Sequence, residues 1–248
     1  MGIVEFKNVS KFFGDKKVLE DADLSIEKGE TITIMGGSGK GKTVFLKLLL
    51  GVLKADKGHI YFHGKDIGEM KEKNVVSMRR HIGMLFQGAA LFDSLSVAEN
   101  VAYPLREHFD YDDNAIAKIV TEKLGLVGMP GVEELMPAEL SGGMKKRVGL
   151  ARAIATDPDI ILYDEPTTGL DPANTKRICN LILELQHKLK VTSIVVTHDM
   201  ESAFRVTDRI AMLSNYKFEF VGTKEEAKNS SIPLVKHFIN GDMDTNDG

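Results

Sequence analysis

The hydrophobic pattern changes along the chain, and each change predicts a different kind of structure. Near the start, apolar and polar positions alternate over residues 3–6 and 18–26, which is typical of paired strands with one exposed face. Further on, short apolar runs predict buried strands at residues 32–35, 82–86, 160–163, 193–196 and 210–213, and residues 58–64 predict a strand between two turn glycines. Buried strands that alternate with helices indicate a parallel sheet covered on both faces.

Helical spacing separates these strands. Residues 44–50 and 173–189 each predict one helix, and the pattern becomes helical again from about residue 112 to residue 157. In that middle region, apolar residues recur at helical spacing: Ile116, Ile119, Val120 and Leu124. An α/β protein with an antiparallel side sheet at its start is therefore expected.

The same pattern predicts the domain organisation. The helical middle, roughly residues 88–157, is expected to be a subdomain inserted into the sheet-containing core. One domain is expected to span residues 1–240. The last residues, 241–248, are acidic and poor in apolar side chains, so they predict a disordered tail.

The candidate chemistry begins directly after the predicted strand at residues 32–35. The next residues fit a phosphate-binding loop without a mismatch: Gly36, Gly37, Ser38, Gly39, Lys40, Gly41, Lys42 and Thr43. Glycines let several backbone N–H groups point inward, and the N-terminus of the following helix adds partial positive charge. Lys42 can then reach the β- and γ-phosphates of a nucleotide, and the Thr43 hydroxyl can ligate Mg²⁺.

Four polar residues that follow predicted strands suggest hydrolysis. Asp164 stands where a carboxylate can hold the magnesium shell, and Glu165 can polarise an attacking water as a general base. Gln87 could bridge the metal or the water, and His198 could hold the γ-phosphate. Each residue taken alone is an ordinary loop residue, but beside a phosphate loop the set predicts a hydrolytic site.

A second stretch suited to anions opens a helix far from the phosphate loop. Ser141 is a natural N-cap, and Gly142 and Gly143 beside it expose backbone N–H groups. Basic residues follow them. The stretch is either a capped helix with a solvated basic face or the second half of a nucleotide site.

Composition limits the remaining classes. The 248 residues carry a net charge of −4 and no basic tail, so electrostatics give no support to nucleic-acid binding. The single cysteine, Cys179, lies in a helical pattern and is expected to be buried, and one cysteine suits a reducing compartment. No apolar run approaches the roughly 20 residues of a membrane helix, and the N-terminus does not resemble a secretory signal. A cytoplasmic protein is expected, with any membrane role supplied by a partner.

In this order and at this spacing, the motifs resemble the nucleotide-binding subunit of ATP-binding-cassette transporters over residues 3–222. Residues 36–43 match its phosphate loop, Gln87 its glutamine loop, and residues 140–144 its signature. The resemblance implies a P-loop NTPase core with a parallel sheet, an N-terminal antiparallel β subdomain and an inserted α-helical subdomain. It also implies ATP hydrolysis, with ATP and Mg²⁺ as cofactors.

The resemblance assigns roles to single residues. It makes Asp164 the magnesium aspartate, Glu165 the catalytic base and His198 the switch histidine. It places Asp171 in a loop that crosses a head-to-tail dimer, in which each ATP lies between one phosphate loop and Ser141–Gly143 of the second copy. Phe13 occupies the adenine-stacking position, with Phe12 as an alternate and a core aromatic as the plain alternative. The implied magnesium ligands are Thr43, Gln87 and Asp164.

Residues 84–107 and 136–144 look like the ATPase of the Mla-type, MCE-associated phospholipid transporters of bacterial envelopes. This narrower resemblance implies phospholipid trafficking through a separate integral membrane permease, at the cytoplasmic face of the inner membrane. An MCE-type lipid-binding protein and an accessory subunit are further implied partners. The apolar, aromatic residues 89–105 suit either a groove for a permease helix or the core of the helical subdomain.

Other hypotheses stay open from the sequence. The ATPase of an importer for a small polar solute, such as an amino acid, would share every motif. A non-transport cassette ATPase and a nucleotide sensor without hydrolysis are the remaining classes. Two positions depart from the common family pattern, because Met144 replaces a glutamine and Gly37 a proline. Apolar residues near the C-terminus could pack on the body or on another subunit: Ile232, Leu234, Val235, Phe238 and Ile239.

Overall fold

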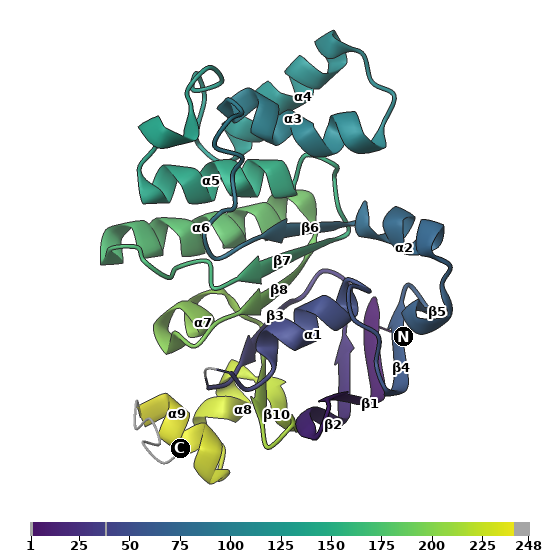
Figure 1. Cartoon of the computed structure of the whole chain (residues 1–248). Coiled ribbons are helices and arrows are strands. Elements are labelled where there is room, and N and C mark those ends of the chain that lie inside the picture. Colours follow the sequence, from purple (N-terminus) through teal and green to yellow (C-terminus); the bar gives the residue numbers. More distant parts are fainter. Residues whose placement is uncertain (1, 38, 241–248) are drawn as a thin grey trace. The chain divides into compact units, whose positions relative to one another are not determined.

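The computed structural model describes residues 2–37 and 39–240 (Figure 1). The chain divides into two compact units, one built from residues 1–70 and 195–248, the other from residues 71–194. The predicted tail at residues 241–248 lies outside the described residues, so its disorder stays a prediction.

The first unit contains the antiparallel side sheet that the alternating pattern predicted. Its strand order is β2-β1-β4-β5, and β1 pairs antiparallel with both β2 and β4. The strands are β1 (Val4–Phe13), β2 (Lys16–Ile26), β4 (Lys57–Phe62) and β5 (Lys65–Asp66). A short 3-10 helix, η1 (Ile67–Glu69), follows them.

A second group of strands in this unit has the order β10-β9-β3. Strand β3 (Thr31–Met35) runs parallel to β9 (Arg209–Ser214), and β10 (Lys217–Thr223) pairs antiparallel with β9. Helix α1 (Lys42–Leu49) follows β3, and its Phe45 ring stacks on Phe6 of β1 at 4.6 Å. Strand β10 was not predicted, although its first four residues, Lys217 to Phe220, alternate between polar and apolar.

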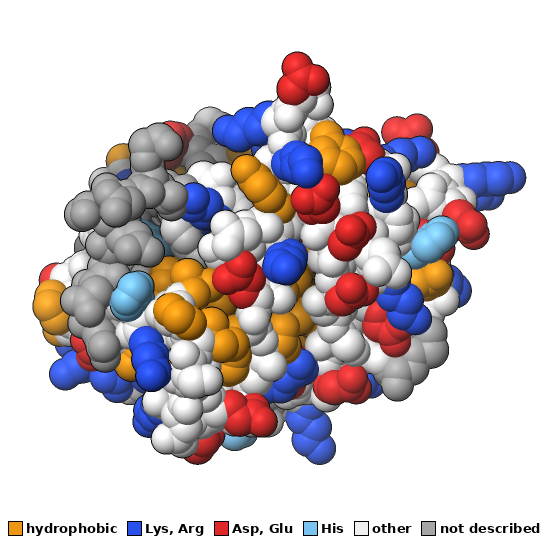
Figure 2. Space-filling model, turned by 90° about the horizontal axis from the view of Figure 1, so that it is seen from below, with side chains coloured by type: hydrophobic (Ala, Val, Ile, Leu, Met, Phe, Trp, Pro, Cys, Tyr) orange, Lys and Arg blue, Asp and Glu red, His pale blue; other side chains and the backbone are white. Residues whose placement is uncertain are grey.

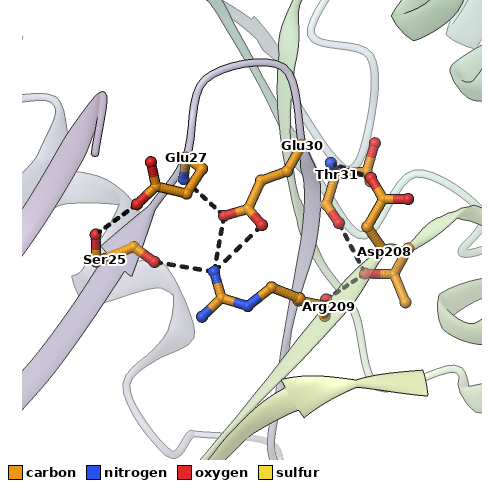
Figure 3. A network of polar contacts seen from close by, with 7 residues as sticks. Ser25, Glu27, Glu30, Thr31, Asp208 and Arg209 are labelled. Atoms are coloured by element: carbon orange, nitrogen blue, oxygen red, sulfur yellow. Dashed lines mark hydrogen bonds and ion pairs between the residues drawn. The ribbon is translucent and has the colours of Figure 1, made fainter. Parts of the chain in front are cut away.

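Polar contacts fasten the amino ends of β3 and β9 to each other (Figure 3). The Thr31 N–H donates to the Asp208 carboxylate at 2.8 Å, and the Asp208 N–H donates to the Thr31 carbonyl at 2.8 Å. The Arg209 guanidinium binds both oxygens of Glu30, at 3.0 and 3.2 Å, and the Ser25 carbonyl at 3.2 Å. These contacts fix the amino ends of the two strands. The pairing register of β3 and β9 then determines which residues lie at their opposite, carboxyl ends.

The C-terminal helices cover part of the first unit. These are α7 (Met200–Val206), α8 (Lys224–Lys228) and α9 (Pro233–Asn240). Val235 is fully buried in a cluster with Met35 and Ala203, and the other apolar residues of this segment pack against the same cluster. The segment therefore packs on the body of its own chain. Figure 2 shows that apolar side chains still reach the surface on this face, among charged ones.

The second unit holds strands in the order β8-β7-β6 and a group of helices. Strand β6 (Ile82–Leu85) runs parallel to β7 (Ile160–Asp164), and β8 (Thr192–Val196) crosses the boundary into the first unit. The helices are α2 (Glu72–Arg79), α3 (Val97–His108), α4 (Asp113–Leu126), α5 (Gly142–Ala153) and α6 (Pro172–Leu189), with a short 3-10 helix η2 (Pro137–Glu139). Within this unit, α5 lies between α3 and α4 on one side and β6 on the other (Figure 1).

The predicted helical region is only partly correct. Residues 112–157 form α4 and α5 with an irregular stretch between them, and α3 lies before residue 112. Helix α4 ends where Gly128 and Gly131 adopt positive φ angles of 67° and 77°, and Pro130 between them prevents another helical turn. Helix α6 matches its prediction, and Cys179 is buried in it as expected. Over residues 2–37 and 39–240, no helix combines the length and the apolar character needed to cross a bilayer.

Candidate active site

The phosphate loop runs from β3 to α1 in the first unit, and its residue Ser38 lies outside the described part. A Cβ atom at Gly36 would lie 2.5 Å from the Leu213 carbonyl oxygen of β9, so only glycine fits. Gly41 ends the loop with a φ of 105°, which favours glycine, and a Cβ there would lie 3.0 Å from Val18 of β2. The loop is therefore held between β9 and β2.

The N-terminus of α1 is suited to bind an anion. Gly41 is its N-cap, and among the described residues no side chain caps it and no acidic residue occupies its first turn. Helix α3 shows the usual alternative, because Ser96 and Glu99 cap it reciprocally, with N–H···O distances of 3.2 and 2.7 Å. The partial positive charge at this helix N-terminus therefore suits an external anion.

Lys42 is buried, and its ammonium lies over its own loop. Nζ donates to the Gly36 carbonyl at 2.6 Å and to the Gly37 carbonyl at 2.9 Å. Thr43, the next residue, is exposed. Lys42 and Thr43, whose ammonium and hydroxyl are expected to meet phosphate and Mg²⁺, therefore both lie at the loop.

His198 belongs to the same unit as the phosphate loop. The Thr197 N–H donates to the Ile34 carbonyl at 3.3 Å, which places the residue after β8 beside the end of β3. His198 is exposed, and Asp199 after it caps α7 by accepting from the Glu201 N–H at 3.1 Å. The structure therefore brings His198 to the edge at which the phosphate loop starts.

Phe13 lies at the end of β1 and is 47 % exposed, which excludes the core-aromatic alternative. It pairs with Lys16 in the β1–β2 hairpin, and Val18 of the same hairpin touches Gly41 of the loop. Its ring already accepts the Lys11 ammonium at 5.5 Å from the centroid. An aromatic face is thus presented beside the phosphate loop.

In the second unit, the parallel register brings the glutamine loop next to the acids. Leu85 of β6 pairs with Tyr163 of β7, so Gln87, Asp164 and Glu165 leave neighbouring strands at the same edge. Gln87 is exposed, and Glu165 is half-buried with a positive φ of 47°.

The signature also lies in the second unit. The Ser141 hydroxyl accepts from the Met144 N–H at 3.3 Å and so caps α5, as the sequence predicted. Ser141 and Gly142 are exposed. A Cβ at Gly143 would lie 3.2 Å from the side chain of Asn174 on α6, so the signature packs against that helix.

Asp171 caps α6 at the same place. Its carboxylate accepts from the N–H groups of Ala173 at 2.9 Å and Asn174 at 3.0 Å. The hydrogen bond from the Asn174 backbone is the main cause that lowers the pKa of Asp171. The structure thus brings the Asp171 loop and the signature together through Asn174.

Sequence reasoning missed two cations on α5. The ammonium of Lys146 donates to the Gln87 carbonyl and, at 3.3 Å, to the Glu165 carbonyl. Burial lowers the pKa of Lys146, and the nearby carboxylates of Asp164 and Glu165 act in the opposite direction. Arg152 binds two further carbonyls. The basic residues of α5 were visible in the sequence. Lys146 and Arg152 bind backbone carbonyls, which every residue carries, so no residue pattern predicts these contacts.

The phosphate loop, the strand-end acids and the signature define an ATP-binding-cassette ATPase. The sequence profile of the family described as "ABC transporter" matches residues 19–168, and the chain belongs to this family. The α/β fold and the ATPase activity expected from the motifs are those of the family.

Individual relatives agree with this assignment. The intermembrane phospholipid transport system ATP-binding protein MlaF of Haemophilus influenzae is 43 % identical, covering 98 % of this chain and 92 % of its own length. The probable ribonucleotide transport ATP-binding protein mkl of Mycobacterium leprae is also 43 % identical, covering 97 % and 70 %. A solved dimeric ATP-binding cassette in a post-hydrolysis state, bound to ADP and Pi, is 32 % identical with a TM-score of 0.80, covering 89 % and 98 %.

Proposed function

We propose that this chain is the ATP-hydrolysing subunit of a transporter that powers phospholipid trafficking across a bacterial envelope through a separate membrane permease. The observation that carries the proposal is its 43 % identity to an intermembrane phospholipid transport ATPase over 98 % of the chain. That similarity covers the glutamine-loop and signature segments, from which the narrower resemblance was drawn.

In the proposed mechanism, the first unit binds the nucleotide. Backbone N–H groups of the phosphate loop and of the first turn of α1, together with the Lys42 ammonium, bind the phosphates. Phe13 stacks on the adenine, and His198 holds the γ-phosphate. Because Lys42 already bonds two loop carbonyls, phosphate oxygens replace an existing interaction of its ammonium instead of ordering a mobile side chain.

The second unit supplies the hydrolytic residues. Glu165 accepts the proton of the attacking water, and Gln87 positions that water. Thr43, Gln87 and Asp164 offer hydroxyl, amide and carboxylate oxygens, the ligand types that fit Mg²⁺. These residues would hold Mg²⁺, and the bound ion would neutralise the negative charge that develops on the phosphate oxygens.

A second copy completes each site in this proposal. Ser141, Gly142 and Gly143 of one chain close over the nucleotide held by the other in a head-to-tail dimer, with Asp171 at the crossing loop. The exposure of Ser141 and Gly142 supports this role, and the solved cassette described above is dimeric. The ATPase rate per chain should therefore rise with protein concentration. A rate per chain that stays constant across the dimerisation range contradicts the dimer.

The permease is proposed to dock on residues 89–105, at the cytoplasmic face of the inner membrane. Both sequence interpretations of this stretch have support, because α3 buries Val101 and Leu105 while Phe92 and Tyr103 stay exposed. The Phe92 and Tyr103 rings pack against each other at 4.7 Å, which makes a compact aromatic surface. An MCE-type lipid-binding protein and an accessory subunit complete the proposed assembly.

One relative favours a second candidate cargo. The name of the mycobacterial relative includes ribonucleotide transport, which agrees with a small polar solute as cargo. Purification of the native complex from membranes, followed by mass spectrometry, separates the two. Co-purified phospholipid with a lipid-binding subunit supports the first candidate, whereas a permease with a soluble solute-binding protein and no enriched lipid replaces it with the second.

A further inference from the structure

Helix α5 places one face against the two loops that carry Gln87 and Glu165. Lys146, Gly149 and Arg152 recur every three residues, so they lie along one side of the helix. All the groups that they contact belong to the unit of residues 71–194. This face is distinct from the signature residues, which only begin the helix.

The Lys146 side chain joins the two loops. Its residue is only 5 % exposed, which excludes the solvated basic face that the sequence left open for this lysine. The ammonium donates to the Gln87 carbonyl and to the Glu165 carbonyl, 59 and 19 residues away in the chain. One buried charge therefore holds two backbone segments that come from different strands.

The rest of the face fixes the glutamine loop further along. A Cβ at Gly149 would lie 3.2 Å from the Cβ of Ala89, so the loop packs directly on the helix backbone. The Arg152 guanidinium donates to the Ala89 carbonyl at 2.7 Å and the Ala90 carbonyl at 2.8 Å. Both alanines have positive φ angles, 62° and 47°, a conformation that needs such support.

Glu165 needs support for the same reason. Its φ of 47° is uncommon for a residue with a side chain, and its carbonyl accepts from Lys146 and from the Thr168 N–H, each at 3.3 Å. The Thr168 hydroxyl also donates to the Glu165 carboxylate at 3.3 Å. The direction of the Glu165 side chain thus depends on a backbone that Lys146 helps to hold.

We propose that Lys146 is a positioning residue for ATP hydrolysis. Its buried ammonium ties the Gln87 loop to the Glu165 backbone and keeps these two segments in the relative positions that hydrolysis requires. This inference rests on the proposed roles of Gln87 and Glu165. A displacement of about 1 Å at a reacting group costs on the order of 10²-fold in rate. Loss of the tie should therefore lower kcat about 10- to 100-fold. The apparent KM for ATP should stay within about twofold, because positioning acts after binding.

The test compares three variants of the full chain. Lys146→Met keeps the length and removes the donors, and Lys146→Arg keeps the charge and the donors. Lys145→Met is the matched control, since this neighbouring lysine is on the same helix and shares no bond with either loop. Hydrogen exchange of residues 86–90 and 165–168 reports loop order without reference to turnover. We expect faster exchange in both segments of Lys146→Met only, and partial recovery of kcat in Lys146→Arg.

A double mutant separates positioning from general damage. If Lys146 acts through Glu165, Lys146→Met should have almost no further effect on kcat in a Glu165→Gln background. A merely structural role would reduce the rate equally in both backgrounds. Thermal unfolding is measured in parallel, and Lys146→Gln, whose shorter amide cannot span both carbonyls, replaces Lys146→Met if that variant does not fold.

Each outcome decides one question. Unchanged exchange in Lys146→Met, or faster exchange with unchanged kcat, overturns the role of Lys146. Equal losses in both backgrounds overturn it as well. Full activity of Glu165→Gln alone instead overturns the proposed catalytic role of Glu165, and the exchange result then still shows whether Lys146 orders the two loops.

Discussion

Two buried lysines, one in each unit, make different kinds of contact. Lys42 and Lys146 each donate from a buried ammonium to backbone carbonyls. The acceptors of Lys42 are five and six residues away in one continuous loop, whereas those of Lys146 belong to two loops that are distant in sequence. The first lysine is thus part of a local motif, and the second depends on tertiary packing.

This difference has a consequence for function. The carbonyls that hold Lys42 belong to the loop that is proposed to surround phosphate, so a phosphate can exchange places with them. The carbonyls that hold Lys146 belong to loops that are proposed to carry the water and the base. Loss of Lys42 should therefore weaken nucleotide binding and rate together, and loss of Lys146 should lower the rate alone.

The largest expected effect is that of Glu165→Gln. Loss of the base should lower kcat about 10²- to 10⁴-fold while leaving ATP binding intact, since the neutral amide cannot take the proton. Steady-state turnover and equilibrium nucleotide binding check both parts. Glu184→Gln, an exposed change on α6, is the control. Turnover at the parent rate would show that another group is the base.

Lys42→Met should lower kcat/KM about 10²- to 10³-fold and also weaken ATP binding, in contrast to Glu165→Gln and Lys146→Met. Its ammonium is the group expected to meet the β- and γ-phosphates. Lys47→Met, in the last turn of α1, is the matched control. If Lys42→Met binds ATP as the parent does and loses only kcat, the proposed difference between Lys42 and Lys146 is wrong.

The same contrast explains what the sequence could predict. The phosphate loop, the strand-end acids and the Ser141 cap are contiguous motifs with side chains of diagnostic type, and their local structure follows from adjacent residues. Lys146 and Arg152 bind carbonyls, which every residue carries, so no residue pattern marks their partners. The division of the helical region into α4 and α5 depended on turns with positive φ, which the apolar spacing alone did not show.

Arg152→Gln tests how much the stability of the second unit depends on the cationic side chains of α5. Burial lowers the pKa of Arg152, but the guanidinium stays charged and bonds two carbonyls of the glutamine loop. Its loss should reduce the free energy of unfolding by about 1–3 kcal/mol, because two carbonyls of the glutamine loop lose a charged donor. Arg106→Gln, which removes an exposed pair with Asp113, should change it by less than about 0.5 kcal/mol. Urea denaturation measures both, and equal changes would show that Arg152 is not specially placed.

The smallest expected effect concerns Lys123, a third buried lysine, whose partners are carboxylates. Its Nζ lies 2.6 Å from Asp157 and 3.1 Å from Glu122. Burial acts to lower the pKa of Lys123, but the bonds to Asp157 and Glu122 outweigh it, so the pKa is raised above 10.5. The folded state therefore holds this proton more tightly than the unfolded state. Its contribution is complete below about pH 10.5 and is lost as the pH rises through the folded pKa.

Lys123→Met should thus lower the free energy of unfolding by at most about 1 kcal/mol at pH 8, because both carboxylates are exposed and regain water. The difference from the parent should shrink as the pH rises beyond about 10.5. Lys118→Met, an exposed change on α4, should show no such trend. Burial lowers the pKa of Lys146 instead, so the parent-minus-variant difference for Lys146→Met should run in the opposite direction with pH. Parallel trends for the two buried lysines would contradict this expectation, because carbonyl and carboxylate partners would then affect the ammonium in the same way.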